Sequence, residues 1–177
     1  YDAFVHETYT QVPDETRQAL SDILSELVGE EDADPYQYIP RVLEYVSTSA
    51  RYDLNTPAVP DGEDFVSWFL HDSETGYCVH YATAATILLR CLGVPARYVT
   101  GYYTNVYENE WTTVTSDNAH AWVEIYLNGI GWLRDDPTPA ADTPAQTAPE
   151  EPIAAPIEPA ENQPEDTPPA GDEPPAA

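Results

Sequence analysis

Residues 76–95 read GYCVHYATAATILLRCLGVP, and this segment determines the predicted fold. Apolar residues recur in it at spacings of three and four, which predicts a helix from Tyr77 to about Leu92. The Gly-Val-Pro sequence at 93–95 then acts as a stop signal. Because this helix is apolar over so much of its surface, we expect it to lie at the centre of the fold.

Cys78 stands in the first turn of this helix, where the helix dipole is positive and backbone N–H groups have no helical partner. Both features favour the thiolate, which is the reactive form of cysteine. A cysteine on an apolar helix is also often an inert buried residue, so periodicity leaves both interpretations open. The second cysteine, Cys91, would lie about 20 Å away along the helix, too far for a disulfide, and we expect it to pack in the core.

The elements on either side of this helix predict an α+β fold. Before it, apolar periodicity and start signals predict helices over residues 13–28, 35–46 and 64–70. After it, β-branched and aromatic runs predict strands over residues 97–103, 111–115, 119–127 and 132–135. Because the helices come first and the strands form a meander, we expect the central helix to pack on an antiparallel sheet.

Two polar residues stand near the ends of the last two strands. His120 begins one strand, and Asp136 ends the strand that returns after Asn128-Gly129, a strong hairpin signal. Neighbouring antiparallel strands lie about 5 Å apart, so this carboxylate can reach the imidazole. Cys78, His120 and Asp136 therefore supply a nucleophile, a base and an orienting group. Asp135 would point to the other face of the strand and ranks second.

Three sequence blocks, at residues 76–102, 120–126 and 131–139, resemble the core of the transglutaminase-like superfamily. They read GYCVHYA followed by LRCLGVPARYVTGY, then HAWVEIY, then GWLRDDPTP. Their order and spacing fit that family, and the resemblance covers roughly residues 13–139. The helical lead is similar to the extracytoplasmic domain of bacterial, membrane-linked members.

The resemblance implies a papain-like fold and a family triad in which Cys78 is the nucleophile, His120 the base and Asp136 its partner. It implies acyl transfer on amides, of the protein-glutamine gamma-glutamyltransferase kind, through a thioester on Cys78. The family also uses a further oxyanion donor, for which Tyr52 and Asn55 are candidates. The same triad would serve a cysteine peptidase or amidase, and a third alternative is a catalytically silent binding or scaffold module.

The charge balance restricts the partners. Thirty-two acidic and six basic residues give a formal charge of −26, which would repel the phosphates of nucleic acid and disfavour an anionic membrane surface. We therefore expect no nucleic acid and no membrane contact by this segment itself. A protein or peptide substrate fits better, with a Lys-bearing amine acceptor or a cell-wall peptide as candidates. The histidines lack partners at ligand spacing, so we predict neither a metal nor a cofactor.

The domain organisation follows from a change in composition after Pro139. Residues 1–140 are predicted to form the transglutaminase-like domain, with a helical lead at 1–75 and the helix and sheet at 76–140. Residues 141–177 contain ten prolines and nine acidic residues. Because a segment of this composition has too few apolar groups to form a core, we expect a disordered tail or linker. The chain lacks Met and starts at Tyr1, so we expect a piece of a longer, extracytoplasmic, membrane-anchored protein at the cell surface.

Overall fold

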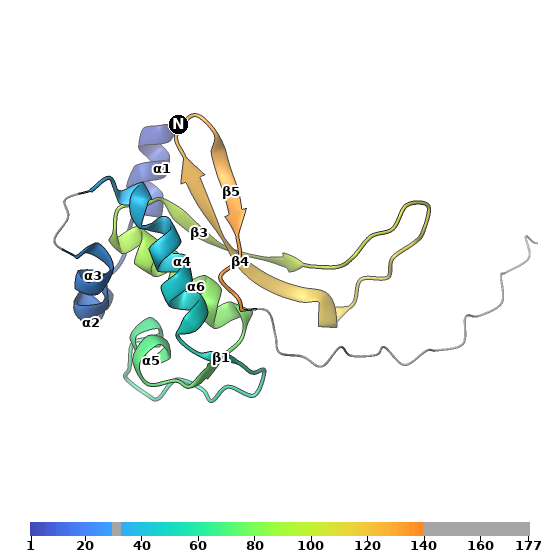
Figure 1. Ribbon diagram of the computed structural model, residues 1–177, viewed down its shortest axis with the longest axis horizontal. Coiled ribbons are helices and arrows are strands. Elements are labelled where there is room, and N and C mark those ends of the chain that lie inside the picture. Colours follow the sequence, from blue (N-terminus) through green and yellow to red (C-terminus); the bar gives the residue numbers. More distant parts are fainter. Residues whose placement is uncertain (30–32, 140–177) are drawn as a thin grey trace, which may run out of the picture. The chain divides into compact units, whose positions relative to one another are not determined.

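The computed structural model describes residues 1–29 and 33–139, and the predicted tail at 141–177 lies outside them. Helices come first along the chain and the larger sheet last (Figure 1). The helices and 3-10 turns are α1 (Asp2–Tyr9), α2 (Asp14–Ala19), α3 (Ser21–Val28), η1 (Pro35–Tyr38), α4 (Ile39–Thr48), α5 (Phe65–His71), α6 (Cys78–Cys91) and η2 (Ser116–Asn118). The strands are β1 (Arg51–Tyr52), β2 (Thr75–Gly76), β3 (Ala96–Tyr102), β4 (Ala119–Leu127) and β5 (Gly131–Asp135).

The larger sheet is antiparallel with the order β3-β4-β5. In its register, His120 lies opposite Gly101 on β3, and Val123 lies opposite Asp135 on β5. The β4–β5 hairpin turns through residues 128–130, where Gly129 has a φ of 76°. The hairpin expected from Asn128-Gly129 is therefore confirmed. It determines which residues of β4 and β5 lie opposite each other.

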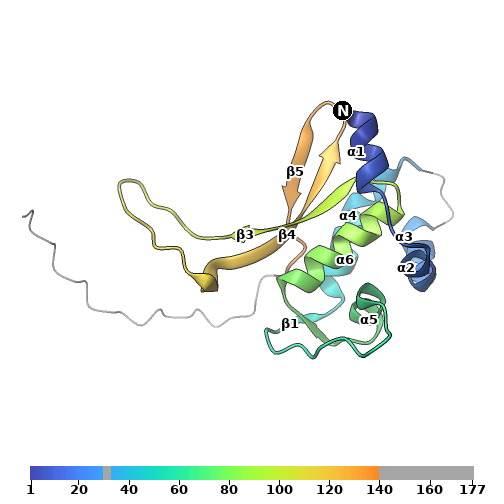
Figure 2. The ribbon, with the colours of Figure 1, turned by 180° about the vertical axis from the view of Figure 1, so that it is seen from behind.

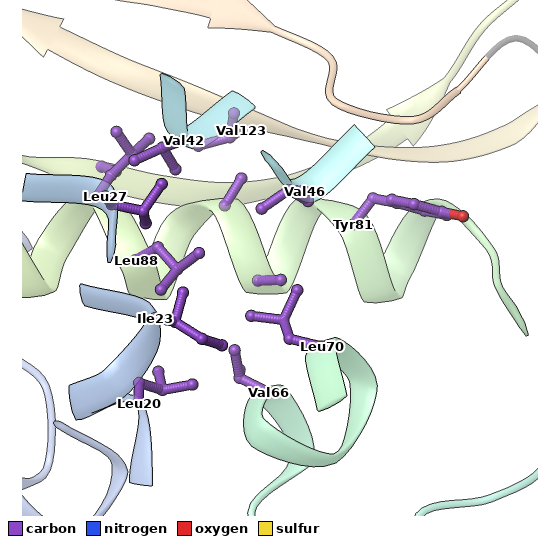
Figure 3. Packing of buried hydrophobic residues seen from close by; sticks show 14 of the residues in the cluster. Leu20, Ile23, Leu27, Val42, Val46, Val66, Leu70, Tyr81, Leu88 and Val123 are labelled. Atoms are coloured by element: carbon purple, nitrogen blue, oxygen red, sulfur yellow. The ribbon is translucent and has the colours of Figure 1, made fainter. Parts of the chain in front are cut away.

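The core surrounds α6, which packs against the sheet on one side and against α4 and α5 on the other (Figures 1 and 3). Alternate residues of β4 face this core, because side chains alternate between the two faces of a strand. Val123 and Ile125 are buried against the helix side, and the apolar faces of α3 and α4 complete the cluster. This is the predicted α+β fold, with a central helix packed on an antiparallel sheet.

The entry into α6 is held by close packing. Gly76 pairs with Tyr52 in the parallel ladder between β1 and β2. A Cβ at Gly76 would lie 2.5 Å from the ring of Phe69, so glycine allows the chain to pass close to α5. The backbone N–H of Tyr77 donates to Nδ1 of His80 at 3.4 Å, which gives an otherwise unpaired N–H a partner at the helix start. These contacts fix where the first turn of α6 begins.

The structure differs from the predicted elements at three places. The helix expected over residues 13–28 is divided into α2 and α3 at Leu20, whose ψ is 10°. No strand forms over residues 111–115, because β3 and β4 stop pairing at Tyr102 and Ala119, and the segment has no neighbouring strand. Helix α1 was not anticipated; it is held by contacts to the sheet, such as the hydrogen bond from Tyr126 to Asp2.

Residues 103–115, which we call the β3–β4 arm, run out from the end of the sheet in both views (Figures 1 and 2). Loops of this length without secondary structure are uncommon in compact domains and are usually either functional or linker segments. The arm exposes the large apolar side chains of Tyr103, Val106, Tyr107, Trp111 and Val114. Its base is tied by two hydrogen bonds between Tyr103 and Asn118.

Candidate active site

A cavity of about 620 Å³ opens between the start of α6 and the ends of β3 and β4. Residues of the helix and residues of the sheet both line it, so it lies where the central helix meets the sheet. Its lining includes Tyr52, Tyr77, Cys78, Tyr98, Tyr102, Asp117 and His120. The cavity therefore brings together two of the three site residues predicted from sequence, Cys78 and His120.

Cys78 is the first residue of α6 and is 9% exposed. It packs in a small cluster with Ala82 of the same helix and Ala121 of β4. Both neighbours are alanines, which allow the helix and the strand to approach closely. The thiol is therefore largely covered by protein while it still reaches the cavity wall.

His120 and Asp136 are hydrogen-bonded to each other. Nε2 of His120 lies 2.6 Å from Oδ2 of Asp136, which is the length of a strong, charge-assisted hydrogen bond. The pairing follows from register, because Asp136 comes directly after Asp135, the partner of Val123. It therefore stands on the same face of the sheet as His120 and Trp122. When Nε2–H is donated to this carboxylate, Nδ1 is the imidazole atom that can accept a proton.

The carboxylate of Asp136 has further partners. Its Oδ1 accepts the backbone N–H of Thr138 at 3.2 Å, and Arg134 lies 3.5 Å from Oδ2. Burial by itself would raise the pKa of Asp136, but the hydrogen bonds from His120 and Thr138 outweigh it, and the pKa lies below its ordinary value. Asp136 is therefore ionised near neutral pH and acts as an acceptor for the imidazole.

Aromatic side chains surround the imidazole of His120. Trp122 is stacked on it at a centroid distance of 6.3 Å and an angle of 27°, and Tyr103 lies 6.1 Å away. The ring of Trp122 crosses the backbone of β3 at Gly101, where a Cβ would come within 2.7 Å of it. Glycine at this position thus makes room for the ring that borders His120.

Tyrosines form much of the cavity wall near Cys78. Burial, followed by the charge of Cys78, raises the pKa of Tyr52 and the pKa of Tyr98. Both phenols are therefore neutral and able to donate a hydrogen bond near neutral pH. Asp117, an exposed acidic residue, is also among the residues that line the cavity. The surroundings combine aromatic surface with negative charge, a combination that suits a cation.

Other residues named from the sequence lie away from this arrangement. Asp135 is exposed, and its Oδ1 accepts the backbone N–H of Asp136. Asn55 is exposed and donates to the carboxylate of Asp53, whereas Tyr52 reaches the cavity. Cys91 lies at the far end of α6 as a free, half-buried thiol, and burial raises its pKa. The expectation that the two cysteines do not bond each other is confirmed.

His80 is buried among aromatic rings instead of lining the cavity. Phe65 stacks on it at 5.1 Å, and Trp68, Phe69 and Tyr77 also contact its ring. Burial lowers its pKa, so it remains neutral and serves the packing at the start of α6.

Across residues 1–29 and 33–139, no group of three His, Cys, Asp or Glu side chains is arranged to hold a metal ion.

Sequence reasoning missed Arg134 and did not connect Trp122 and Tyr103 with His120. The alternation of β5 would have put Arg134 on the same face as Asp136, two residues later. This alternation can be read from the sequence. The contacts that the rings of Trp122 and Tyr103 make with Arg134 and His120 cannot, because they depend on how β4, β5 and the arm pack together.

Comparison with known proteins identifies several relatives. A sequence profile of the Transglutaminase-like superfamily matches residues 23–137. The uncharacterized protein YebA of Bacillus subtilis is 32% identical over 146 residues, covering 78% of this chain and 20% of that protein. A protein-glutamine gamma-glutamyltransferase of Pseudomonas aeruginosa is 43% identical over 89 residues, covering 49% of this chain and 13% of the relative.

A solved structure has a similar fold. The crystal structure of the periplasmic domain of TgpA from Pseudomonas aeruginosa aligns with a TM-score of 0.61 and 33% identity. The alignment covers 77% of this chain and 48% of that domain. The chain thus spans a fifth or less of the two curated relatives above and about half of the solved domain.

Proposed function

The chain belongs to the transglutaminase-like superfamily, and from that premise we propose that it transfers acyl groups from glutamine side chains through a thioester on Cys78. Three observations support the proposal. Cys78 and His120 line one cavity, and His120 is hydrogen-bonded to the ionised Asp136. A relative that is 43% identical over its matched segment is a protein-glutamine gamma-glutamyltransferase.

In the first step, the thiol proton of Cys78 passes to Nδ1 of His120, and the sulfur attacks the carboxamide carbon of the donor. A C–S bond forms as the carbonyl becomes an oxyanion. Collapse of this intermediate breaks the C–N bond, and His120 returns its proton to the leaving ammonia. Asp136 stabilises the imidazolium and fixes its orientation throughout.

The oxyanion needs hydrogen-bond donors at the start of α6. The backbone N–H of Cys78 is one, because the first N–H groups of a helix have no intrahelical partner. Tyr52 is the side-chain donor we propose, since its neutral phenol lines the same cavity, whereas Asn55 is engaged with Asp53. Tyr52→Phe should lower kcat with little change in KM, because a donor used mainly in the transition state is removed. An unchanged kcat would exclude Tyr52 from this role.

In the second step, an amine attacks the thioester carbon, an amide bond forms as the C–S bond breaks, and the amine proton passes through His120 to the sulfur of Cys78. We propose a lysine side chain of a protein as this acceptor. The carboxylate of Asp117 and the tyrosines of the cavity would attract its ammonium group before it loses a proton. The β3–β4 arm, which follows Tyr102 of the cavity wall, adds exposed apolar rings and the exposed acidic residues Glu108 and Glu110. Exposed aromatic surface of this kind is common at protein interfaces.

The thioester could equally be opened by water, which gives deamidation, or could form from a peptide bond. A glutamine peptide library and a labelled primary amine, analysed by mass spectrometry, separate these outcomes. We expect the amine to be incorporated at glutamine, with Cys78→Ala abolishing both product and acyl-enzyme. Cys91→Ala is the matched control, because it removes the other thiol of the same helix and should retain activity. Cleaved peptides without incorporated amine would replace the transferase by a peptidase.

We also propose that this segment works outside the cytoplasm, as part of a larger membrane-anchored protein. The supporting observation is the similarity to a periplasmic domain. Among the described residues, none of the helices has the length and hydropathy needed to cross a bilayer. The location is tested by treating intact cells that express the full-length protein with a cysteine-reactive, membrane-impermeant label. Labelling of Cys78 only after lysis would contradict it.

A further inference from the structure

The candidate acid–base pair has a third polar neighbour that the reaction scheme leaves without a role. Arg134 lies on β5 opposite Glu124, diagonally across from Trp122. Its guanidinium stands 3.5 Å from Oδ2 of Asp136, the same oxygen that accepts Nε2 of His120. Its side chain is 44% exposed, so a simple surface ion pair would be a weak interaction.

The surroundings of Arg134 differ from those of an ordinary surface pair. Its guanidinium carbon lies 4.9 Å from the ring centroid of Trp122 and 5.3 Å from that of Tyr103. Two aromatic rings thus restrict the guanidinium plane, a contact that arginine makes and the point charge of lysine reproduces only in part. The same two rings lie against the imidazole of His120.

We propose that Arg134 is a positioning residue for His120, a role that rests on the proposed function. Its guanidinium joins the carboxylate partner of His120 to the two rings that contact its imidazole, and so restrains the ring on three sides. Because Nε2 is held by Asp136, Nδ1 is the ring nitrogen left to accept a proton, and His120 lines the same cavity as Cys78. Displacements of about 1 Å at a reacting group can lower rates about 100-fold, so a restraint at one remove from His120 has a measurable effect.

Variants at this position separate positioning from charge and from stability. Arg134→Gln removes the charge and the stacked plane, and Arg134→Lys retains the charge alone. Arg51→Gln is the matched control, because Arg51 on β1 also has an exposed guanidinium in an ion pair, with Asp53 at 3.6 Å. Folding is checked for each variant by circular dichroism and thermal unfolding.

Two measurements apply to each variant. The first is the NMR signal of the Nε2–H proton of His120, assigned with His120→Gln, which does not depend on turnover. The second is kcat and KM for amine incorporation into a glutamine peptide. We expect Arg134→Gln to broaden or lose the Nε2–H signal and to lower kcat about tenfold with KM unchanged. Arg134→Lys should lie between it and the wild type, and Arg51→Gln should match the wild type.

The outcomes distinguish this inference from the function on which it rests. An Nε2–H signal and a kcat that Arg134→Gln leaves unchanged would overturn the positioning role, even in an active enzyme. Arg134→Gln could abolish the Nε2–H signal in a protein whose Cys78 forms no acyl-enzyme. That result would support the coupling of Arg134 to His120 and contradict the proposed transferase activity. Full rescue by Arg134→Lys would reduce the role to charge alone and also contradict it.

Discussion

Replacing Asp136 by asparagine tests the hydrogen bond on which the candidate site depends. The 2.6 Å contact between Oδ2 and Nε2 of His120 is charge-assisted, which is worth about 1.5–3 kcal/mol, against about 0.5–1.5 kcal/mol for a neutral bond. The difference is about 1–2 kcal/mol, or about 5- to 30-fold in a rate that depends on it. The 30% exposure of the Asp136 side chain places the expected loss toward the lower end.

The assay is the rate at which iodoacetamide alkylates Cys78, followed by mass spectrometry from about pH 5 to about pH 9. We expect Asp136→Asn to slow alkylation, because His120 loses the carboxylate that stabilises its positive charge when it takes up the thiol proton. Asp135→Asn is the control: it is adjacent and exposed, and the asparagine oxygen can still accept the N–H of Asp136. Slower alkylation in Asp135→Asn together with an unchanged rate in Asp136→Asn would contradict the assignment of Asp136 as the partner of His120.

The same substitution has a stability signature with a definite sign. The pKa of Asp136 is lower in the folded protein than its ordinary value, so the group stabilises the fold above the ordinary carboxyl range. That contribution is lost as the pH falls from about 4 through the folded-state pKa. The difference in free energy of unfolding between wild type and Asp136→Asn should therefore shrink on acidification, as measured by urea unfolding at several pH values.

Three further predictions concern the surroundings of the site. Gly101→Ala should lower the free energy of unfolding by about 1–3 kcal/mol, seen as a lower melting temperature, because its Cβ would meet the ring of Trp122 at 2.7 Å. Burial lowers the pKa of His80, so on acidification the unfolded chain takes up a proton before the folded protein does, and the fold loses stability below about pH 6.5. His80→Phe should remove this pH-dependent loss, as measured by urea unfolding. Trp111→Ala should raise KM about tenfold for a Lys-bearing protein acceptor in an incorporation assay, because it deletes a fully exposed ring of the arm.

Each of these has an outcome that would contradict it. A melting temperature unchanged in Gly101→Ala would mean that the ring of Trp122 moves freely away from β3. An acid-sensitive slope that persists in His80→Phe would assign it to another group. The arm variant is compared with a small diamine as acceptor, whose KM should not change. Equal effects on the diamine and the protein would place Trp111 outside protein docking.

Much of the architecture was predictable from local pattern. The three- and four-residue spacing after Gly76 specified α6 with Cys78 at its start, since a helix buried on many sides needs apolar residues on many sides. Alternation over residues 119–127 and the Asn-Gly turn specified the β4–β5 hairpin. The pairing of His120 with Asp136 then followed, because a hairpin fixes which strand residues are neighbours.

Local pattern failed where a partner element decides the outcome. Residues 111–115 have the composition of a strand, but a strand needs a neighbour, and β3 and β4 separate before reaching them. The break at Leu20 and the docking of α1 likewise depend on what each helix packs against.

The linear pattern of residues specifies a thiol at a helix start, and an imidazole and a carboxylate joined by a hairpin. Folding of the whole chain is needed to bring the thiol and the imidazole to one cavity, and to place Arg134, Trp122 and Tyr103 around His120 and its carboxylate partner. The difference lies in the sequence separation over which each kind of interaction acts. Periodicity and turns act over a few residues, whereas these contacts join β5, β4 and the arm through the register and packing of the sheet.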